Sequence, residues 1–233
     1  MSVSEPLHEV KLRYQGIDML RSVKYLLWDL DGTLYRSDPD LLNAIQREIY
    51  MRMATVLSIP YQEAKKRFLT VYARLGGATA TVVELGLDRS LIQEAVDSVD
   101  KGKYVKPDPK LRDMFESELR TFDHIIVTNT SREGTVRTLE VLGLSQQIFQ
   151  GIVTADDVLR AKPDVEPYLK ALEITGGPVH EHVSIGDREK VDILPAKRLG
   201  MKTILVWGTS EAADASVPTV YDVPKVLRRI SQI

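Results

Sequence analysis

Two aspartates, Asp29 and Asp31, stand between the apolar run Tyr25-Leu26-Leu27-Trp28 and a turn that begins with glycine. An apolar run without polar alternation predicts a strand buried on both faces of a parallel sheet. Because residues i and i+2 of a strand project to the same side, both carboxylates should share one small space at the strand end. Two like charges about 4 Å apart repel by roughly 4 kcal/mol at an effective dielectric near 20. We therefore expect a cation, a shared proton or a ligand to offset this repulsion.

Two other interpretations of this acidic pair are an ordinary turn and a calcium-binding loop. Asp and Gly favour turns, so the segment could be an ordinary turn after a strand. A calcium-binding EF-hand loop needs Gly at its sixth position and Glu at its twelfth. The chain has Leu34 and Asp40 there, which excludes that loop. The decision between a turn and a working site depends on whether other strand ends carry matching polar residues.

Matching polar residues do follow the later apolar runs, or stand just before a predicted helix. They are Thr128, Asn129, Lys162, Asp187 and Asp192. Any one of them alone could be a helix cap or a solvated charge. Their joint occurrence in one α/β chain favours a common site, because ligands gather beyond the carboxyl ends of parallel strands.

These residue types have the composition of a phosphoryl-transfer site. The oxygen-rich acidic set is suited to Mg²⁺ rather than zinc, which prefers His and Cys ligands. A hydroxyl, an amide, a lysine and backbone N–H groups would bind a phosphoryl group. One carboxylate can attack phosphorus and form an aspartyl-phosphate. A second carboxylate, two residues on, can protonate the leaving oxygen and later deprotonate the attacking water.

Alternating strands and helices predict a doubly wound parallel sheet of the α/β class. The predicted strands after the first cover residues 124–127, 151–153, 182–185 and 203–207, with a weaker one at 219–221. The predicted helices between them cover about 108–119, 132–142, 164–174, 190–199 and 224–231. Right-handed crossovers in such a sheet bring the polar strand ends to one edge.

Residues 37–105 interrupt this alternation with helical patterns alone, which predicts an all-helical insertion between two linkers rich in Pro and Asp. The expected helices cover about 41–57, 59–75, 79–85 and 90–99. The sequence thus predicts an N-terminal extension at 1–23, a core domain at 24–36 and 106–233, and a helical cap domain at 37–105.

Bulk composition places the chain among ordinary globular proteins. It has 233 residues, 43% hydrophobic content and a net charge of −2, so we expect no nucleic-acid partner and no electrostatic attraction to membranes. No apolar run reaches the length of a membrane span, and residues 1–23 do not have the composition of a secretory signal. The absence of cysteine excludes thiolate chemistry and fits a cytoplasmic protein. The sequence does not predict the oligomeric state.

The order of the motifs resembles that of the haloacid-dehalogenase-superfamily hydrolases, over about residues 24–210. The resemblance implies a Rossmann-like core sheet with a helical cap inserted between the first and second motifs. By position it implies Asp29 as the nucleophile and Asp31 as the acid and base, whose backbone carbonyl also meets the metal.

The remaining implied roles follow the later motifs. Thr128 and Lys162 would bind the phosphoryl group, and Asn129 would orient the site. Asp187 would join Asp29 and Asp31 as a ligand of Mg²⁺, and Asp192 would support that site or ligate the metal through water.

Asp31 separates the branches of this family. Members of the dehalogenase branch have a similar first motif that lacks the second Asp, because a halide leaves without a proton donor. Phosphatases keep the second Asp, which protonates the departing alkoxide. The resemblance therefore implies a phosphatase acting on a small phosphorylated metabolite, such as a nucleotide or a phosphosugar. The chain is weakly similar to pyrimidine 5'-nucleotidase-like members. Thr130 and Arg188 depart from the common pattern, which has smaller residues there, and both alter the expected pocket.

Three alternatives stay open at this level. One is a phosphosugar mutase of the same fold. Another is a phospho-accepting signalling domain, because such domains also cluster aspartates at the ends of parallel strands. Those domains are about half the length of this chain. A non-catalytic protein of this fold is the third.

Overall fold

The computed structural model describes residues 23–231, so the predicted extension at 1–23 lies, except for Val23, outside the described residues. Six strands form one sheet in the order β3-β2-β1-β4-β5-β6, and every neighbouring pair is parallel. Their bounds are β1 Tyr25–Trp28, β2 Asp123–Val127, β3 Phe149–Val153, β4 His182–Gly186, β5 Lys202–Val206 and β6 Ala215–Val217. The predicted doubly wound parallel sheet is confirmed, with β1 in its interior.

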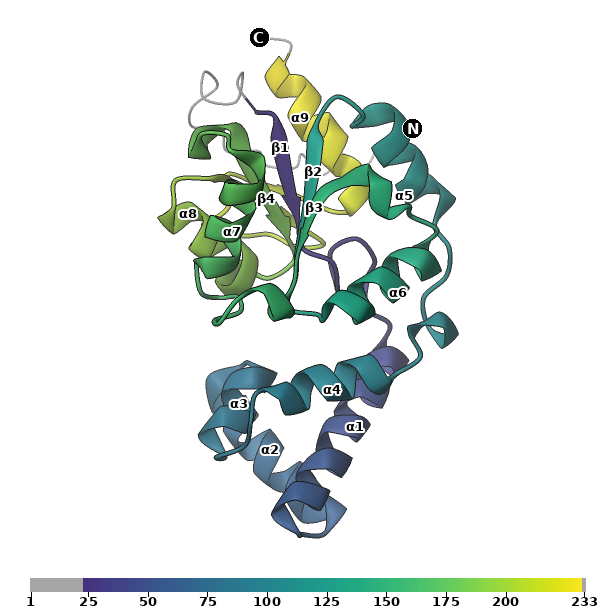
Figure 1. Cartoon of the computed structure of the whole chain (residues 1–233), viewed down its shortest axis with the longest axis vertical. Helices are drawn as coiled ribbons and strands as arrows, with labels where there is room; N and C mark the ends of the chain where they lie inside the picture. Colours follow the sequence, from purple (N-terminus) through teal and green to yellow (C-terminus); the bar gives the residue numbers. More distant parts are fainter. Residues whose placement is uncertain (1–22, 232–233) are drawn as a thin grey trace, which may run out of the picture.

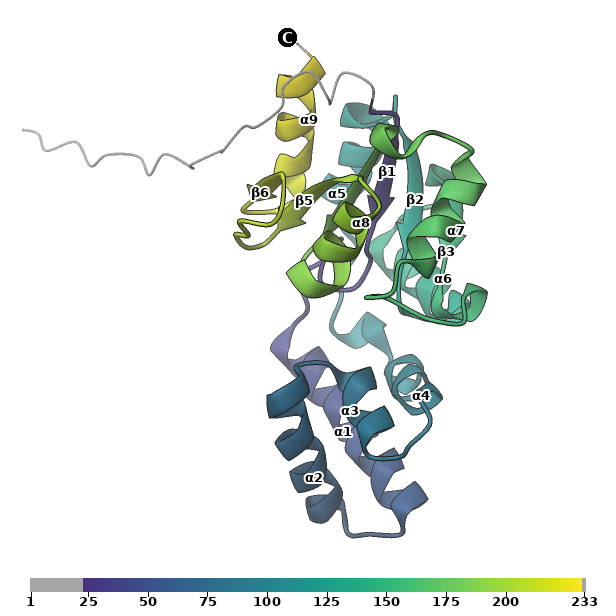
Figure 2. The same cartoon turned by 90° about the vertical axis from the view of Figure 1, so that its left-hand side faces the viewer.

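Within the described residues, five helices pack against the sheet, and four others stand between β1 and the first of these five in the sequence. The first five are α5 Pro109–Asp113, α6 Arg132–Leu142, α7 Glu166–Thr175, α8 Leu194–Arg198 and α9 Val223–Ser231. The other four are α1 Pro39–Leu57, α2 Tyr61–Leu75, α3 Ala78–Glu84 and α4 Ser90–Ser98. We call α1–α4 the helical block. It lies beyond the carboxyl ends of the strands (Figures 1 and 2).

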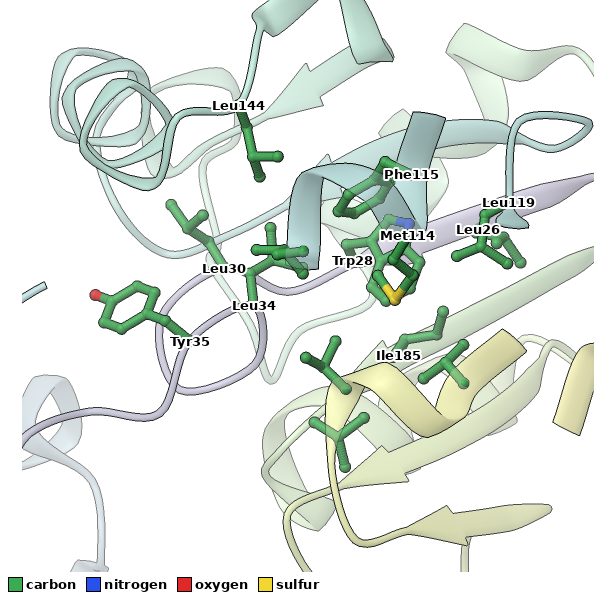
Figure 3. Packing of buried hydrophobic residues seen from close by; sticks show 14 of the residues in the cluster. Leu26, Trp28, Leu30, Leu34, Tyr35, Met114, Phe115, Leu119, Leu144 and Ile185 are labelled. Atoms are coloured by element: carbon green, nitrogen blue, oxygen red, sulfur yellow. The ribbon is translucent and has the colours of Figure 1, made fainter. Parts of the chain in front are cut away.

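Alternate residues of β1 face opposite layers of helices, as the period of a strand requires. Leu26 and Trp28 pack in the cluster that includes side chains of α5, α6 and α9, whereas Leu27 packs with side chains of α7 and α8. Trp28 is fully buried, and the Phe115 ring meets it edge-on at 5.1 Å between centroids (Figure 3). Burial on both faces explains why this strand has no polar residue before Asp29.

The helical block has a hydrophobic core of its own, formed by α1–α4 and the segments that join them. Local signals set its helix ends. The Asp38 carboxylate caps α1 by accepting a hydrogen bond from the Asp40 N–H at 2.7 Å, and Pro39 fills the first helical position. Gly76 ends α2 with a left-handed φ of 70°. The sequence therefore supplies both the start of the block and the break between α2 and α3.

The weak strand predicted at 219–221 is wrong. The sixth strand is Ala215–Val217, and Val220–Asp222 forms a 3-10 turn. Pro218 separates the two and lacks the N–H that a continued ladder needs. Val220 is buried in the core from this turn, which accounts for the apolar character that suggested a strand.

Within residues 23–231, no helix combines the length and the apolar character that a membrane crossing requires.

Candidate active site

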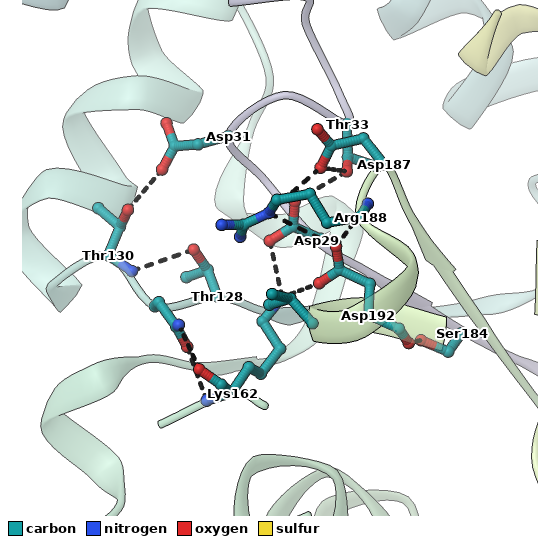
Figure 4. Close-up of polar contacts among 12 residues, drawn as sticks. Asp29, Asp31, Thr33, Thr128, Thr130, Lys162, Ser184, Asp187, Arg188 and Asp192 are labelled. Carbon is teal, nitrogen blue, oxygen red and sulfur yellow. Dashed lines mark hydrogen bonds and ion pairs between the residues drawn. The ribbon is translucent and has the colours of Figure 1, made fainter. Parts of the chain in front are cut away.

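Asp29 lies at the carboxyl end of β1, and its backbone N–H donates to the Ile185 carbonyl at 2.9 Å. Its side chain is 3% exposed. The Oδ1 atom accepts a hydrogen bond from Lys162 Nζ at 2.7 Å, and Oδ2 accepts one from Thr33 Oγ1 at 2.8 Å (Figure 4). The carboxylate is thus held in a fixed orientation by a cation and a hydroxyl. Thr33 belongs to the turn after β1, but sequence reasoning gave it no role.

Lys162 is the cation that offsets the charge of Asp29. Its Nζ also donates to Asp192 Oδ1 at 2.7 Å, and its side chain is 1% exposed. Burial alone would lower the pKa of Lys162, but the Asp192 and Asp29 carboxylates raise it above its ordinary value. The lysine is therefore charged, and the structure brings it together with two acids from distant parts of the sequence.

Asn129 positions the backbone of Lys162. Its Nδ2 donates to the Lys162 carbonyl at 2.8 Å, and its Oδ1 accepts from the Lys162 N–H at 2.9 Å. This reciprocal pair joins the loop after β2 to the segment before α7. Thr128 lies at the end of β2, and its Oγ1 accepts from the Thr130 N–H at 3.1 Å. The phosphoryl-binding role of Thr128 stays a prediction.

Asp31 has a different set of partners from Asp29. Its Oδ1 accepts a hydrogen bond from Lys101 Nζ at 2.6 Å and another from the Tyr35 hydroxyl, and Oδ2 accepts one from the Thr130 hydroxyl. Burial alone would raise the pKa of Asp31, but Lys101 and the two hydroxyls hold it below its ordinary value. The repulsion expected between Asp29 and Asp31 is therefore offset by two separate lysines rather than by one shared cation.

The sequence did not indicate Lys101 or Tyr35. Lys101 lies in a 3-10 turn, Lys101–Lys103, that follows α4, and no pattern distinguishes it from Lys103 two residues later. Tyr35 lies on the segment that leads from β1 into the helical block. Each of the two connections to the block thus supplies one partner of Asp31.

Asp29, Asp187 and Asp192 each offer a carboxylate oxygen within 4.8 Å of the others. Close backbone approach builds this cluster. A Cβ at Gly32 would lie 2.6 Å from an Asp187 oxygen, and Gly32 also has a left-handed φ of 93°. Burial, aided by the charge of Asp29, raises the pKa of Asp187 to about 6. Three hard oxygen donors in this space fit a Mg²⁺ ion, whereas the Asp31 carboxylate is outside the cluster and faces Lys101.

Helix α4 contacts the core next to this site through residues spaced four apart. Arg89, at its N-terminal end, donates to the Leu159 carbonyl. The side-chain nitrogen of Gln93 faces the backbone carbonyl of Asn129 and donates a hydrogen bond to that carbonyl at 3.1 Å. One oxygen of Asp97 is buried against Gly134, where an added methyl group would overlap it, and has no hydrogen-bond partner among the described residues. One face of α4 thus lies on the loops that carry the site.

The class of protein follows from sequence comparison. Residues 26–206 match the haloacid dehalogenase-like hydrolase family, and the chain belongs to that family. It is 29% identical over 217 residues to a phosphoglycolate phosphatase from Aquifex aeolicus, and the matched segment covers 88% of this chain and 97% of the relative. It is also 29% identical over 194 residues to pyrophosphatase PpaX from Halalkalibacterium halodurans, covering 79% and 83%. The expected hydrolase of the phosphatase type is confirmed.

Solved structures share the fold. An HAD phosphatase from Thermococcus onnurineus superposes with a TM-score of 0.65 at 24% identity, over 88% of this chain and 98% of that one. A hydrolase from Pseudomonas syringae also gives 0.65, at 21% identity over 89% and 99%. The sequence-based recognition of the family and its fold is therefore confirmed.

Proposed function

We propose that the protein is a Mg²⁺-dependent phosphomonoesterase that hydrolyses a small phosphate ester through an aspartyl-phosphate on Asp29. The observation that carries this proposal is the environment of Asp29. Its buried carboxylate is oriented by Lys162 and Thr33 and lies in one cluster with Asp187 and Asp192. A nucleophile held in place before the substrate arrives needs little reorganisation during the reaction.

In the first half of the proposed reaction, an oxygen of Asp29 forms a bond to phosphorus as the bond from phosphorus to the ester oxygen breaks. Lys162 offsets charge on the phosphoryl oxygens, and Asp31 in its protonated form gives its proton to the departing oxygen. In the second half, Asp31 takes a proton from water, and the water oxygen displaces Asp29 from phosphorus. Phosphate is released and the Asp29 carboxylate is restored.

Asp29, Asp187 and Asp192 would hold Mg²⁺ through side-chain oxygens, and the backbone carbonyl of Asp31 is the further ligand that the family resemblance implies. A bound Mg²⁺ would offset the repulsion between the carboxylates and the phosphoryl group. Asp187 completes the cluster and would be protonated in competition with the metal, because its pKa is raised to about 6.

We propose that residues 24–36 and 106–233 form the catalytic domain and residues 37–105 a cap domain. The separate hydrophobic core of the helical block and its place beyond the strand ends support this division. The catalytic side chains can recognise only a phosphoryl group, so the cap would contact the rest of the substrate. A cytoplasmic enzyme is supported by the absence of cysteine.

The substrate proposed is a small phosphorylated metabolite. The names of the two relatives, phosphoglycolate phosphatase and pyrophosphatase, support a small substrate. Neither name indicates a nucleotidase, so the nucleotide or phosphosugar preference stays a prediction.

Release of inorganic phosphate from p-nitrophenyl phosphate tests the proposal. We expect turnover with Mg²⁺ and loss of turnover with excess chelator. Phosphate release separates hydrolysis from a mutase reaction, which keeps the phosphoryl group on the sugar. Absence of phosphate release from p-nitrophenyl phosphate and from a panel of phosphorylated metabolites would contradict the proposed function.

A further inference from the structure

Arg188 is the first residue after Asp187 and lies beside the acidic cluster. Its backbone N–H donates to Asp192 Oδ2 at 3.1 Å, which fixes the start of its side chain. Figure 4 shows the side chain extending over Asp29 toward the side of the site where Asp31 and Thr130 lie. In this view the guanidinium lies on the same side of Asp29 as Asp31, the proposed donor of a proton to the leaving group.

The other cations at this site already hold carboxylates at hydrogen-bond distance. Lys162 contacts Asp29 and Asp192 at 2.7 Å each, and Lys101 contacts Asp31 at 2.6 Å. Their side chains are 1% and 9% exposed, whereas that of Arg188 is 51% exposed. Before substrate binds, Lys101 and Lys162 are thus buried and hydrogen-bonded to the protein's own acids, and neither is exposed to a group at the far end of the substrate.

The ion pairs of Arg188 are longer. Its Nε lies 3.8 Å from Asp187 Oδ1 and 3.9 Å from Asp192 Oδ2. These distances exceed that of a hydrogen bond, so the contacts do not use the directional N–H donors of the guanidinium. A guanidinium carries five such donors in a planar fork that matches a carboxylate or a phosphate in two parallel bonds. The half-exposed Arg188 is suited to an anion that arrives with the substrate.

We propose that Arg188 is a specificity-determining residue that binds a second anionic group, a carboxylate or a phosphate, on the leaving group of the substrate. The inference rests on the proposed function, because it takes Asp29 as the site of phosphoryl transfer. The substrates it selects are phosphate esters or anhydrides with a second negative group close to the bridging oxygen. A neutral leaving group of the same size gains nothing from the guanidinium.

A matched pair of substrates tests this inference. Phosphoglycolate and 2-hydroxyethyl phosphate have nearly the same size, and they differ in a carboxylate against a neutral hydroxymethyl group. We expect the wild-type protein, assayed as the full chain with Mg²⁺, to have the higher kcat/KM on phosphoglycolate. Arg188→Gln should lower the ratio of the two kcat/KM values by about 10- to 100-fold, as for loss of a charge-assisted bidentate contact. Arg188→Lys should restore part of the ratio.

Pyrophosphate in place of phosphoglycolate distinguishes a phosphate from a carboxylate as the preferred second anion. Lys190→Gln removes an exposed charge two residues further on and should leave the ratio unchanged. Melting temperatures of all variants show whether each is folded.

An equal loss on both substrates in Arg188→Gln would mean that the guanidinium only neutralises the acidic cluster, and would overturn the inference. A wild-type protein that hydrolyses both esters without preference would also overturn it and would leave the proposed phosphatase function standing. If the wild-type protein releases no phosphate from these substrates or from p-nitrophenyl phosphate, the proposed function fails and the inference fails with it.

Discussion

Lys101 Nζ lies 2.6 Å from Asp31 Oδ1, across 70 residues of sequence. The lysine follows the helical block and also donates to Thr138 Oγ1 at 3.1 Å, so it is fixed on the core as well. It is the cation nearest to the proposed acid and base, and it favours the ionised form of that residue. The protonation of Asp31 therefore depends on a residue 70 positions further along the chain.

Lys101→Met tests this dependence. Without the cation, the pKa of Asp31 should rise, because Lys101 and the hydrogen bonds from Thr130 and Tyr35 hold it down against burial. We expect the limb of the pH–rate profile that reports Asp31 to move to higher pH. Lys103→Met removes an exposed charge in the same short turn and serves as the control. If the pH–rate profiles of Lys101→Met and the wild-type protein coincide, Lys101 does not control the pKa of Asp31.

Asp29→Asn should reduce turnover to below about one thousandth of the wild-type value, since asparagine matches the shape but offers no anionic nucleophile. Lys162 keeps Asp192 as a partner at 2.7 Å, so we expect the fold to persist. Phosphate release and a cooperative thermal melt measure the two properties together. A folded variant with undiminished phosphate release would rule out Asp29 as the nucleophile.

Asp31→Asn should slow hydrolysis most for poor leaving groups, because these depend on a proton donor. We expect a loss of about 10²- to 10⁴-fold for alkyl esters and a smaller loss for activated aryl esters. The measurement is kcat/KM across a series of esters whose leaving groups differ widely in pKa. A uniform loss across the series would argue against Asp31 as the acid.

Affinity for Mg²⁺ should fall as the pH is lowered through about 6, the value to which burial and the charge of Asp29 raise the pKa of Asp187. Above this pH the carboxylate is ionised and can bind the metal; below it, a proton occupies the ligand atom. One competing proton lowers the affinity by about tenfold for each pH unit below the pKa. Calorimetric titration with Mg²⁺ between pH 5 and pH 8 checks the slope, and Asp187→Asn should bind weakly throughout. If the affinity for Mg²⁺ did not change between pH 5 and pH 8, the role of Asp187 as a metal ligand would be contradicted.

Arg74 and Thr79 flank the break between α2 and α3, where we expect part of the substrate to contact the cap. Arg74 forms an exposed ion pair with Glu84 at 2.8 Å, and such pairs add little stability. Arg74→Ala and Thr79→Ala should therefore leave the fold intact and reorder the preferred natural substrates more than they change turnover of p-nitrophenyl phosphate.

The control for these variants is Arg67→Ala, which removes another exposed ion pair at 2.8 Å, between Arg67 and Glu63 within α2. A panel of phosphorylated metabolites gives the substrate order for each variant. An order that stays the same in both test variants would place the specificity determinants elsewhere in the cap.

The parts of the fold that the sequence predicts are those set by local patterns. The apolar run before Asp29 predicts a strand covered on both faces, and the polar strand ends of a parallel sheet then meet at one edge. The strand predicted at 219–221 is wrong because three residues of types common in strands, Thr-Val-Tyr, fit a turn with one buried side chain as well as a strand. The local pattern at these residues is too short to distinguish a strand from a turn.

The partners of Asp31 depend instead on tertiary packing. Lys101 and Lys103 are the same residue type in the same turn, and their different environments arise from how the turn packs on α6. No spacing in the sequence carries that information. Arg188 was recognisable as a departure from the family pattern, but its direction over Asp29 required the structure.

The spacing of Arg89, Gln93 and Asp97 along α4 constrains how this segment can vary. A residue in an α-helix is rotated by about 100° from the one before it, so four residues return to nearly the same face. Insertion or deletion of one residue between Gln93 and Asp97 would turn Asp97 away from Gly134 while Arg89 and Gln93 kept their places. Substitutions on the outward face of α4 leave this phase intact. Within α4, changes of residue type on the outward face should therefore be tolerated far better than changes of length.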